Sequence, residues 1–229
     1  MCRAAALSTL IQDLMKLLKK IFALASLTLG ALAFAPLASA QEAPDALIKR
    51  ISQEVIETAK SDKDIQAGNQ KKVLELVEAK VLPHVDFQRM TALAAGRFWR
   101  EASPEQQKQL TNEFRSLLVY TYSGAISQIK DQKLEFKPMR GDPSDTDVEV
   151  RTQVIQPRGG DPIQLNYRLE KSTGGWKIYD VNVLGAWLVE TYKGNFAAEI
   201  SKGGIDGLIK TLADKNKRLA ASAAKTAKS

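Results

Sequence analysis

Asp180 is the side chain of this sequence whose type and setting come nearest to those of a catalytic group. It lies in a largely apolar stretch, Gly175 to Leu184, that reads as a β-strand. Burial raises the pKa of a carboxylic acid, and a carboxylate with a raised pKa can act as a general base in an apolar cavity. The alternative is a structural carboxylate that accepts hydrogen bonds from the backbone, an arginine or a tyrosine. No matched acid or oxyanion donor accompanies Asp180, which favours the structural role.

The other reactive side chains are too few for the common catalytic and metal sites. His84 is the only histidine, so neither a catalytic triad nor a zinc site can be built on histidines. Asp142, Asp145 and Asp147 crowd one loop, but the loop lacks the glycine and the terminal glutamate of the usual calcium-binding loop. The glycine pairs lie in expected hairpin turns rather than in a phosphate-binding loop. We therefore expect no catalytic residue, no metal and no cofactor.

The first forty residues are typical of a secretory signal peptide with an extension upstream of Met15. Three lysines precede an apolar run from Ile21 to Leu32, and Ala38-Ser39-Ala40 fits the small-residue cleavage pattern before Gln41. A retained membrane helix is the alternative, but the apolar run is short for a bilayer span. Cys2, the only cysteine, would leave with the leader, so the mature chain would hold together without disulfides.

The charge of the expected mature chain is mildly basic. The full chain has 33 basic and 26 acidic residues, and the leader carries four and one of these, which leaves 29 against 25 and a net charge of +4. We expect one domain over residues 41–218 and a disordered basic tail over residues 219–229. The basic excess toward the tail fits an anionic lipid surface or an acidic partner, or else a solvated, frayed terminus. Export argues against nucleic acid as a partner.

Hydrophobic periodicity predicts helices at both ends of the domain and strands between them. Apolar residues recur at helical spacing in the helices, whereas they alternate in the strands. The expected helices are Pro44 to Ser61, Gln70 to Val81, Asp86 to Ala95, Pro104 to Gln128 with a bend near Gly124, Trp187 to Ser201 and Ile205 to Lys217. The expected strands are Leu134 to Pro138, Asp147 to Gln156, Pro162 to Lys171 and Gly175 to Leu184. Short turns make the strands antiparallel, so the class is α+β, a curved four-stranded antiparallel sheet covered by helices.

The last strand keeps its alternation only in part. Strict alternation would place Tyr179, Val181 and Val183 on the face toward the helices. Trp176 and Ile178 would then lie on the opposite face and pack against a terminal helix, and Asp180 and Asn182 would lie nearer to solvent. A shift of the phase by one residue would exchange the two faces.

Six segments, in this order and spacing, resemble the toluene-tolerance proteins, the periplasmic phospholipid-binding component of the bacterial maintenance-of-lipid-asymmetry pathway. The segments are Leu82 to Phe87, Gly96 to Arg100, Pro104 to Gln107, Asn166 to Leu169, Gly175 to Val181 and Gly203 to Ile209. The resemblance covers roughly residues 44 to 215. Two positions depart from the family pattern: Trp187 stands where a serine is usual, and Lys193 stands where an arginine often follows the tyrosine.

The resemblance implies a carrier rather than an enzyme. Such a carrier is a monomer in the periplasm of a Gram-negative bacterium, and its cargo is a glycerophospholipid. Its partners are the substrate-binding subunit of an inner-membrane ABC transporter and an outer-membrane lipoprotein–porin complex. Its fold is similar to nuclear-transport-factor-like folds, with the acyl chains in a cavity between helices and sheet.

The expected lining of that cavity is a set of large apolar and aromatic side chains near the long helix, on the sheet and in the first helix after it. They are Phe87, Met90, Phe98, Trp99, Phe114, Leu118, Val150, Val154, Leu165, Tyr167, Tyr179, Val181, Val183, Leu188 and Tyr192. Arg97 and Arg100 are the candidates for headgroup contacts. Two other functions stay open, a cavity enzyme that uses Asp180 as base on a small apolar substrate, and an adaptor with a filled core.

Overall fold

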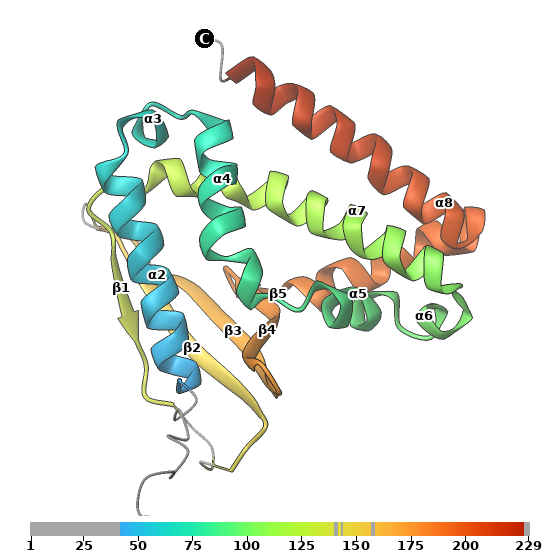
Figure 1. Ribbon diagram of the computed structural model, residues 1–229, viewed down its shortest axis with the longest axis horizontal. Coiled ribbons are helices and arrows are strands. Elements are labelled where there is room, and N and C mark those ends of the chain that lie inside the picture. Colours follow the sequence, from blue (N-terminus) through green and yellow to red (C-terminus); the bar gives the residue numbers. More distant parts are fainter. Residues whose placement is uncertain (1–41, 140–141, 143, 157–158, 227–229) are drawn as a thin grey trace, which may run out of the picture. The chain divides into compact units, whose positions relative to one another are not determined.

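The computed structural model describes residues 42–139, 142, 144–156 and 159–226, and the expected leader lies outside them. Its elements follow the predicted order, with a helical first half, a strand-rich middle and a helical end (Figure 1). All described residues belong to one unit, Gln41–Ser229. The first half contains α2 (Pro44–Ser61), α3 (Lys63–Gln66), α4 (Gln70–Lys80), the 3₁₀ helix η1 (Leu82–His84), α5 (Phe87–Ala95), α6 (Phe98–Glu101), α7 (Pro104–Tyr122) and the 3₁₀ helix η2 (Ser123–Gln128).

Local capping signals set the starts of these helices. Pro44 is the first residue of α2, where its missing N–H costs nothing. The side chain of Asp86 accepts a hydrogen bond from the Arg89 N–H and caps α5. Ser103 and Gln106 form a reciprocal capping box at the start of α7. The predicted bend near Gly124 is the change from α7 to the tighter η2.

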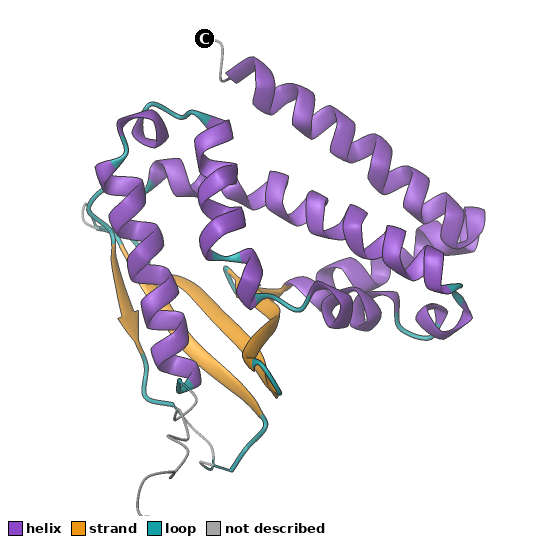
Figure 2. Cartoon of the chain, in the orientation of Figure 1, coloured by secondary structure: helices purple, strands orange, loops and turns teal. Residues whose placement is uncertain are grey.

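The sheet has five strands in the order β1-β2-β3-β4-β5, all antiparallel to their neighbours (Figure 2). The four expected strands are all present, and the prediction of an α+β fold with an antiparallel sheet is confirmed. The fifth strand is two residues long and contains Trp187, which was predicted to begin the following helix. The strands are β1 (Lys133–Phe136), β2 (Asp147–Ile155), β3 (Ile163–Ser172), β4 (Gly175–Val183) and β5 (Ala186–Trp187).

A β-bulge at Tyr179 explains the broken alternation of β4. Leu169 pairs with Ile178 and Arg168 pairs with Asp180, so Tyr179 is an extra residue in β4. Because directly paired residues share a face, Trp176 and Ile178 lie on the same face as Val181 and Val183. The expectation that these two pairs lie on opposite faces is therefore wrong, as is the grouping of Tyr179 with the two valines.

The bulge also changes the place of the polar residues of β4. Asp180 and Asn182 lie on the outer face of the sheet, yet they are only 1% and 5% exposed, so the expectation that they lie near solvent is wrong. Trp187 of β5 is paired with Asn182 and covers this face. The guanidinium of Arg168 lies over the Trp187 ring at 3.8 Å from its centroid.

The apolar interior consists of two clusters rather than one. The first, which we call the sheet cluster, joins α2, α3 and α4 to the inner face of β2, β3 and β4. The second, the helix cluster, joins α5, α7 and α8 (Leu188–Thr226), with Phe114 at 4.9 Å between ring centroids from both Tyr192 and Phe196. Figure 1 shows the same division, with α2 along the sheet and the last part of α8 beside α7.

The C-terminal helix α8 is two helices joined at Gly204, as the glycine pair predicted. The second of them continues to Thr226, so the expected disorder of residues 219–229 is wrong for residues 219–226. Leu219 is partly buried against the helix cluster, which gives the extra turns an apolar contact.

Gly204 has a backbone conformation that only glycine adopts readily, with φ 67° and ψ −171°. Gly204→Ala is therefore expected to lower the free energy of unfolding by about 1–3 kcal/mol. Gly203→Ala is the matched control, because Gly203 has no positive φ and a Cβ there would meet nothing within 4 Å. Urea unfolding measures both variants, and equal stabilities would contradict the assigned strain.

Candidate functional site

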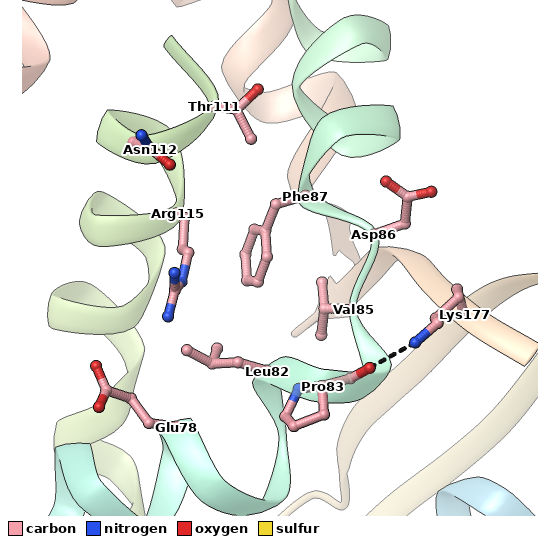
Figure 3. A pocket seen from close by; sticks show the side chains of 10 residues that line it. All are labelled: Glu78, Leu82, Pro83, Val85, Asp86, Phe87, Thr111, Asn112, Arg115 and Lys177. Carbon is pink, nitrogen blue, oxygen red and sulfur yellow. Dashed lines mark hydrogen bonds between the residues drawn. The ribbon is translucent and has the colours of Figure 1, made fainter. Parts of the chain in front are cut away.

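A pocket of about 540 Å³ lies between α7 and the segment that links α4 to α5 (Figure 3). Its floor in Figure 3 is apolar, with Leu82, Val85 and Phe87 pointing into it, and charged side chains stand around this floor. The complete lining is Glu78, Leu82, Pro83, Val85, Asp86, Phe87, Thr111, Asn112, Arg115 and Lys177.

The chain reaches this place because α4 cannot continue through Pro83. The segment turns into η1 and then pairs with the sheet, where Val85 bridges to Ile178 and the Asp86 N–H donates to the Ile178 carbonyl at 2.8 Å. The Nζ of Lys177 donates to the Pro83 carbonyl at 2.6 Å. These contacts fix the segment between α4 and α5 on β4, so the floor of the pocket is anchored to the sheet.

The pocket adjoins the boundary between the two apolar clusters. Val85 is partly buried and packs against both clusters, and Val181 of β4 does the same. Phe87 packs against the helix cluster alone. We call this boundary, marked by Val85 and Val181, the seam. An apolar ligand in the pocket would therefore contact the seam between the two clusters.

Of the predicted cavity residues, only Phe87 lines the pocket, and thirteen others fall into three groups. Five are fully enclosed in the clusters: Met90, Phe114, Leu118, Val150 and Leu188. Six are partly buried against the clusters: Phe98, Trp99, Tyr167, Val181, Val183 and Tyr192. Val154 and Leu165 are half-buried on the inner face of the sheet.

Tyr179 is the predicted cavity residue that lies elsewhere. Its hydroxyl donates to the Asp147 carboxylate, and burial raises its pKa to about 12. Arg89 of α5 lies over its ring at 4.2 Å and forms ion pairs with Asp147 and Glu170. Tyr179 therefore belongs to a polar cluster that ties α5 to β2, β3 and β4.

The predicted headgroup candidates do not line the pocket, whereas two other cations do. Arg97 lies over the Phe98 ring at 4.9 Å and Arg100 is exposed. Arg115, in the middle of α7, and Lys177, on β4, are the cations of the pocket. Sequence reasoning missed both, because nothing along the chain shows that position 115 of a helix and position 177 of a strand face one space.

Asp180 has the structural surroundings that the sequence favoured. Its Oδ1 accepts hydrogen bonds from the N–H groups of Val181 and Val189 at 2.9 and 3.0 Å, and its Oδ2 lies 3.5 Å from Arg168. Burial raises its pKa, and the two backbone hydrogen bonds oppose that rise. Asp180 does not line the pocket. The carboxylate, which is only 1% exposed, therefore holds the start of α8 on β4.

The loop aspartates and His84 are likewise engaged in local contacts. Asp142 accepts hydrogen bonds from Ser144, and Asp145 accepts one from the Asp142 N–H. Burial, then the cations Arg50 and Lys177, lower the pKa of His84. Within the described part of the chain, no three acidic, histidine or cysteine side chains gather as they would around a metal ion.

No helix among the described residues is both long enough and apolar enough to cross a bilayer.

Comparison with known proteins gives one family. The model of the MlaC protein family matches residues 49–214. The intermembrane phospholipid transport system binding protein MlaC of Haemophilus influenzae is 26% identical over 201 residues, which cover 84% of this chain and 91% of that protein. The toluene tolerance protein ttg2D of Pseudomonas putida is 24% identical over 176 residues, which cover 76% and 80%.

A solved structure is similar over most of the chain. It is the phospholipid-binding protein from Ralstonia solanacearum in complex with a phospholipid, with 47% sequence identity and a TM-score of 0.73. The similarity covers 77% of this chain and 98% of that one.

Proposed function

The chain belongs to the MlaC protein family, and from this premise we propose that it binds a glycerophospholipid and carries it between membranes. The observation that supports the proposal most directly is the likeness to a solved protein that has a phospholipid bound, at 47% identity. The divided interior supports it independently, because a pocket with an apolar floor adjoins the seam between two clusters.

The energetics of a carrier fit an apolar interior of this kind. A phospholipid has roughly 30 chain carbons, and each methylene buried from water contributes about 0.8 kcal/mol. Leaving a bilayer for water would therefore cost on the order of 20 kcal/mol. A protein that offers its own apolar interior replaces one apolar environment by another, so loading and unloading can both be nearly neutral.

The size of the pocket indicates what loading would require. Two acyl chains need a cavity near the upper end of the range for ligand pockets, about 1,000 Å³. The pocket measures about 540 Å³, so the proposal requires the two clusters to separate along the seam. The half-buried residues Val85, Val181 and Phe87 would then contact the chains, together with the other partly buried residues of the predicted set.

On this proposal the protein is a monomeric carrier in the periplasm of a Gram-negative bacterium rather than an enzyme. It would exchange lipid with the substrate-binding subunit of an inner-membrane ABC transporter and with an outer-membrane lipoprotein–porin complex. The name of the Haemophilus relative, a binding protein of an intermembrane phospholipid transport system, supports transport between two membranes.

Mass spectrometry of an organic extract tests the proposal. The protein is purified from cells that express the full chain, beside an unrelated exported protein of similar size. We expect about one phospholipid per chain in the extract, and only background in the control. An extract that matches the control would contradict the carrier.

A further inference from the structure

The pocket carries charges of both signs around its apolar floor. Glu78 of α4 and Asp86 before α5 are its carboxylates, and Arg115 of α7 and Lys177 of β4 are its cations. In Figure 3, Glu78 and Arg115 flank Leu82 on one side, whereas Asp86 and Lys177 lie on the other. The four side chains sum to zero charge, so the rim has no net attraction for an anion.

Two of these four charges already have partners within the protein. The Asp86 carboxylate accepts a hydrogen bond from the Arg89 N–H at 2.8 Å and caps α5. The Lys177 ammonium donates to the Pro83 carbonyl at 2.6 Å, which holds it at the mouth of the pocket. Both side chains are therefore fixed by contacts that the fold itself requires.

Glu78 and Arg115 differ from that pair. Both line the pocket, and across the described residues neither makes a hydrogen bond or an ion pair, with each other or with any other side chain. Two other carboxylates of the neighbouring helices are paired: Glu75 with Lys72, and Glu54 with Lys80 and Arg50. An unpaired carboxylate and an unpaired guanidinium thus face one space from two helices.

A ligand that carries both a negative and a positive group could form ion pairs with both Arg115 and Glu78. We propose that the rim selects a zwitterionic, amine-bearing phospholipid headgroup, with the phosphate on Arg115 and the ammonium on Glu78. The planar fork of an arginine suits phosphate oxygens. Leu82, Val85 and Phe87 lie beside the charges and would contact the first methylenes of the chains. This inference rests on the proposed function and adds a preference among headgroups.

An anionic headgroup would pair with only one of the two unpaired side chains, Arg115. A phosphatidylglycerol offers the same phosphate to Arg115, but it brings uncharged hydroxyls to Glu78. The difference between the two lipids is then one solvent-exposed ion pair, because Glu78 is exposed. An exposed ion pair of this kind would favour the amine-bearing lipid over phosphatidylglycerol by about two- to fivefold.

A competition between two lipids tests the headgroup preference. The delipidated protein is incubated with vesicles of equimolar phosphatidylethanolamine and phosphatidylglycerol with identical chains, and the bound lipids are counted by native mass spectrometry. We expect the wild type to be enriched about two- to fivefold in phosphatidylethanolamine. Glu78→Gln should bring the ratio to about one.

Glu75→Gln is the matched control, because Glu75 lies on the same helix, is paired with Lys72 and does not line the pocket. It should keep the wild-type ratio. Arg115→Gln should lower the load of both lipids, since both carry the phosphate. A wild type that takes up the two lipids in the donor ratio, or a Glu78→Gln variant with the wild-type preference, would overturn the inference and leave the carrier intact. A wild type that takes up neither lipid would overturn the carrier and this inference with it.

Discussion

Replacing Asp180 by alanine is expected to lower the free energy of unfolding by about 3 kcal/mol or more, because each buried donor left without an acceptor costs about 1–3 kcal/mol. The substitution leaves the N–H groups of Val181 and Val189 without their acceptor, at a position where the side chain is only 1% exposed. Denaturant unfolding at pH 7 measures the loss. A value within about 1 kcal/mol of the wild type would contradict the structural role of the carboxylate.

Asp180→Asn is the control that separates the hydrogen bonds from the charge. Its amide oxygen can still accept from both N–H groups, so most of the stability should remain.

Burial raises the pKa of Asp180, so the folded protein retains the proton of this carboxyl group to higher pH than the unfolded chain. The carboxyl therefore contributes most to stability below about pH 4, the unfolded pKa, and that contribution is lost as the pH rises through the folded pKa. The stability of the wild type relative to Asp180→Asn should fall over that interval, and an opposite slope would contradict the assigned shift.

Val181→Trp is expected to lower lipid affinity roughly 5- to 150-fold while the protein stays folded. Val181 is half-buried at the seam, and an indole there would fill the space that acyl chains need when the clusters separate. Overpacking costs typically about 1–3 kcal/mol. Because this cost falls on the lipid-loaded state, it corresponds to a loss of roughly 5- to 150-fold in affinity. The bound phospholipid per chain, counted in organic extracts, measures the effect, and a cooperative thermal transition verifies folding.

Val119→Trp is the matched control for this substitution. Val119 is also half-buried, but it lies on α7 and belongs to neither cluster, so its variant should keep its lipid. Leu165→Trp is the second test variant, since Leu165 lies on the same sheet face, opposite Val183. A folded Val181→Trp or Leu165→Trp protein with the full lipid load would show that the chains do not use the seam.

The helices could be predicted from the sequence because their signals are local. The proline at the start of α2, the aspartate cap of α5 and the Ser103–Gln106 box each act within one turn of chain, so the order of residues is sufficient to locate them. The family could also be predicted, since six short segments in a fixed order carried the resemblance. Its confirmation came from the match over residues 49–214.

The bulge at Tyr179 could not be predicted in the same way. A register shift is a property of two strands, and its evidence is the pairing of Leu169 with Ile178 beside that of Arg168 with Asp180. The apolar pattern of β4 alone shows that alternation fails but does not show which residue is the extra one. One misplaced residue was enough to assign Trp176 and Ile178 to the wrong face and Asp180 to solvent.

The candidate site could be predicted only in part, for a related reason. Large apolar residues such as Phe114 and Met90 were good predictions of the interior, but periodicity does not separate a packed interior from a cavity wall. The charged lining comes from elements that are distant in the sequence. Glu78, Arg115 and Lys177 meet only because η1 is pinned to β4 and α7 crosses beside it.

The strand order of the sheet equals the order of the strands along the chain, and this has a consequence for how the protein folds. Each strand pairs with its immediate predecessor, and two residues, Thr173 and Gly174, join β3 to β4, as Leu184 and Gly185 join β4 to β5. Such hairpins close small loops, which lose little chain entropy, and folding is faster when contacts are local. The sheet can thus grow by adding one hairpin at a time. Folding in this order would shorten the period in which the apolar strands are open to non-native association.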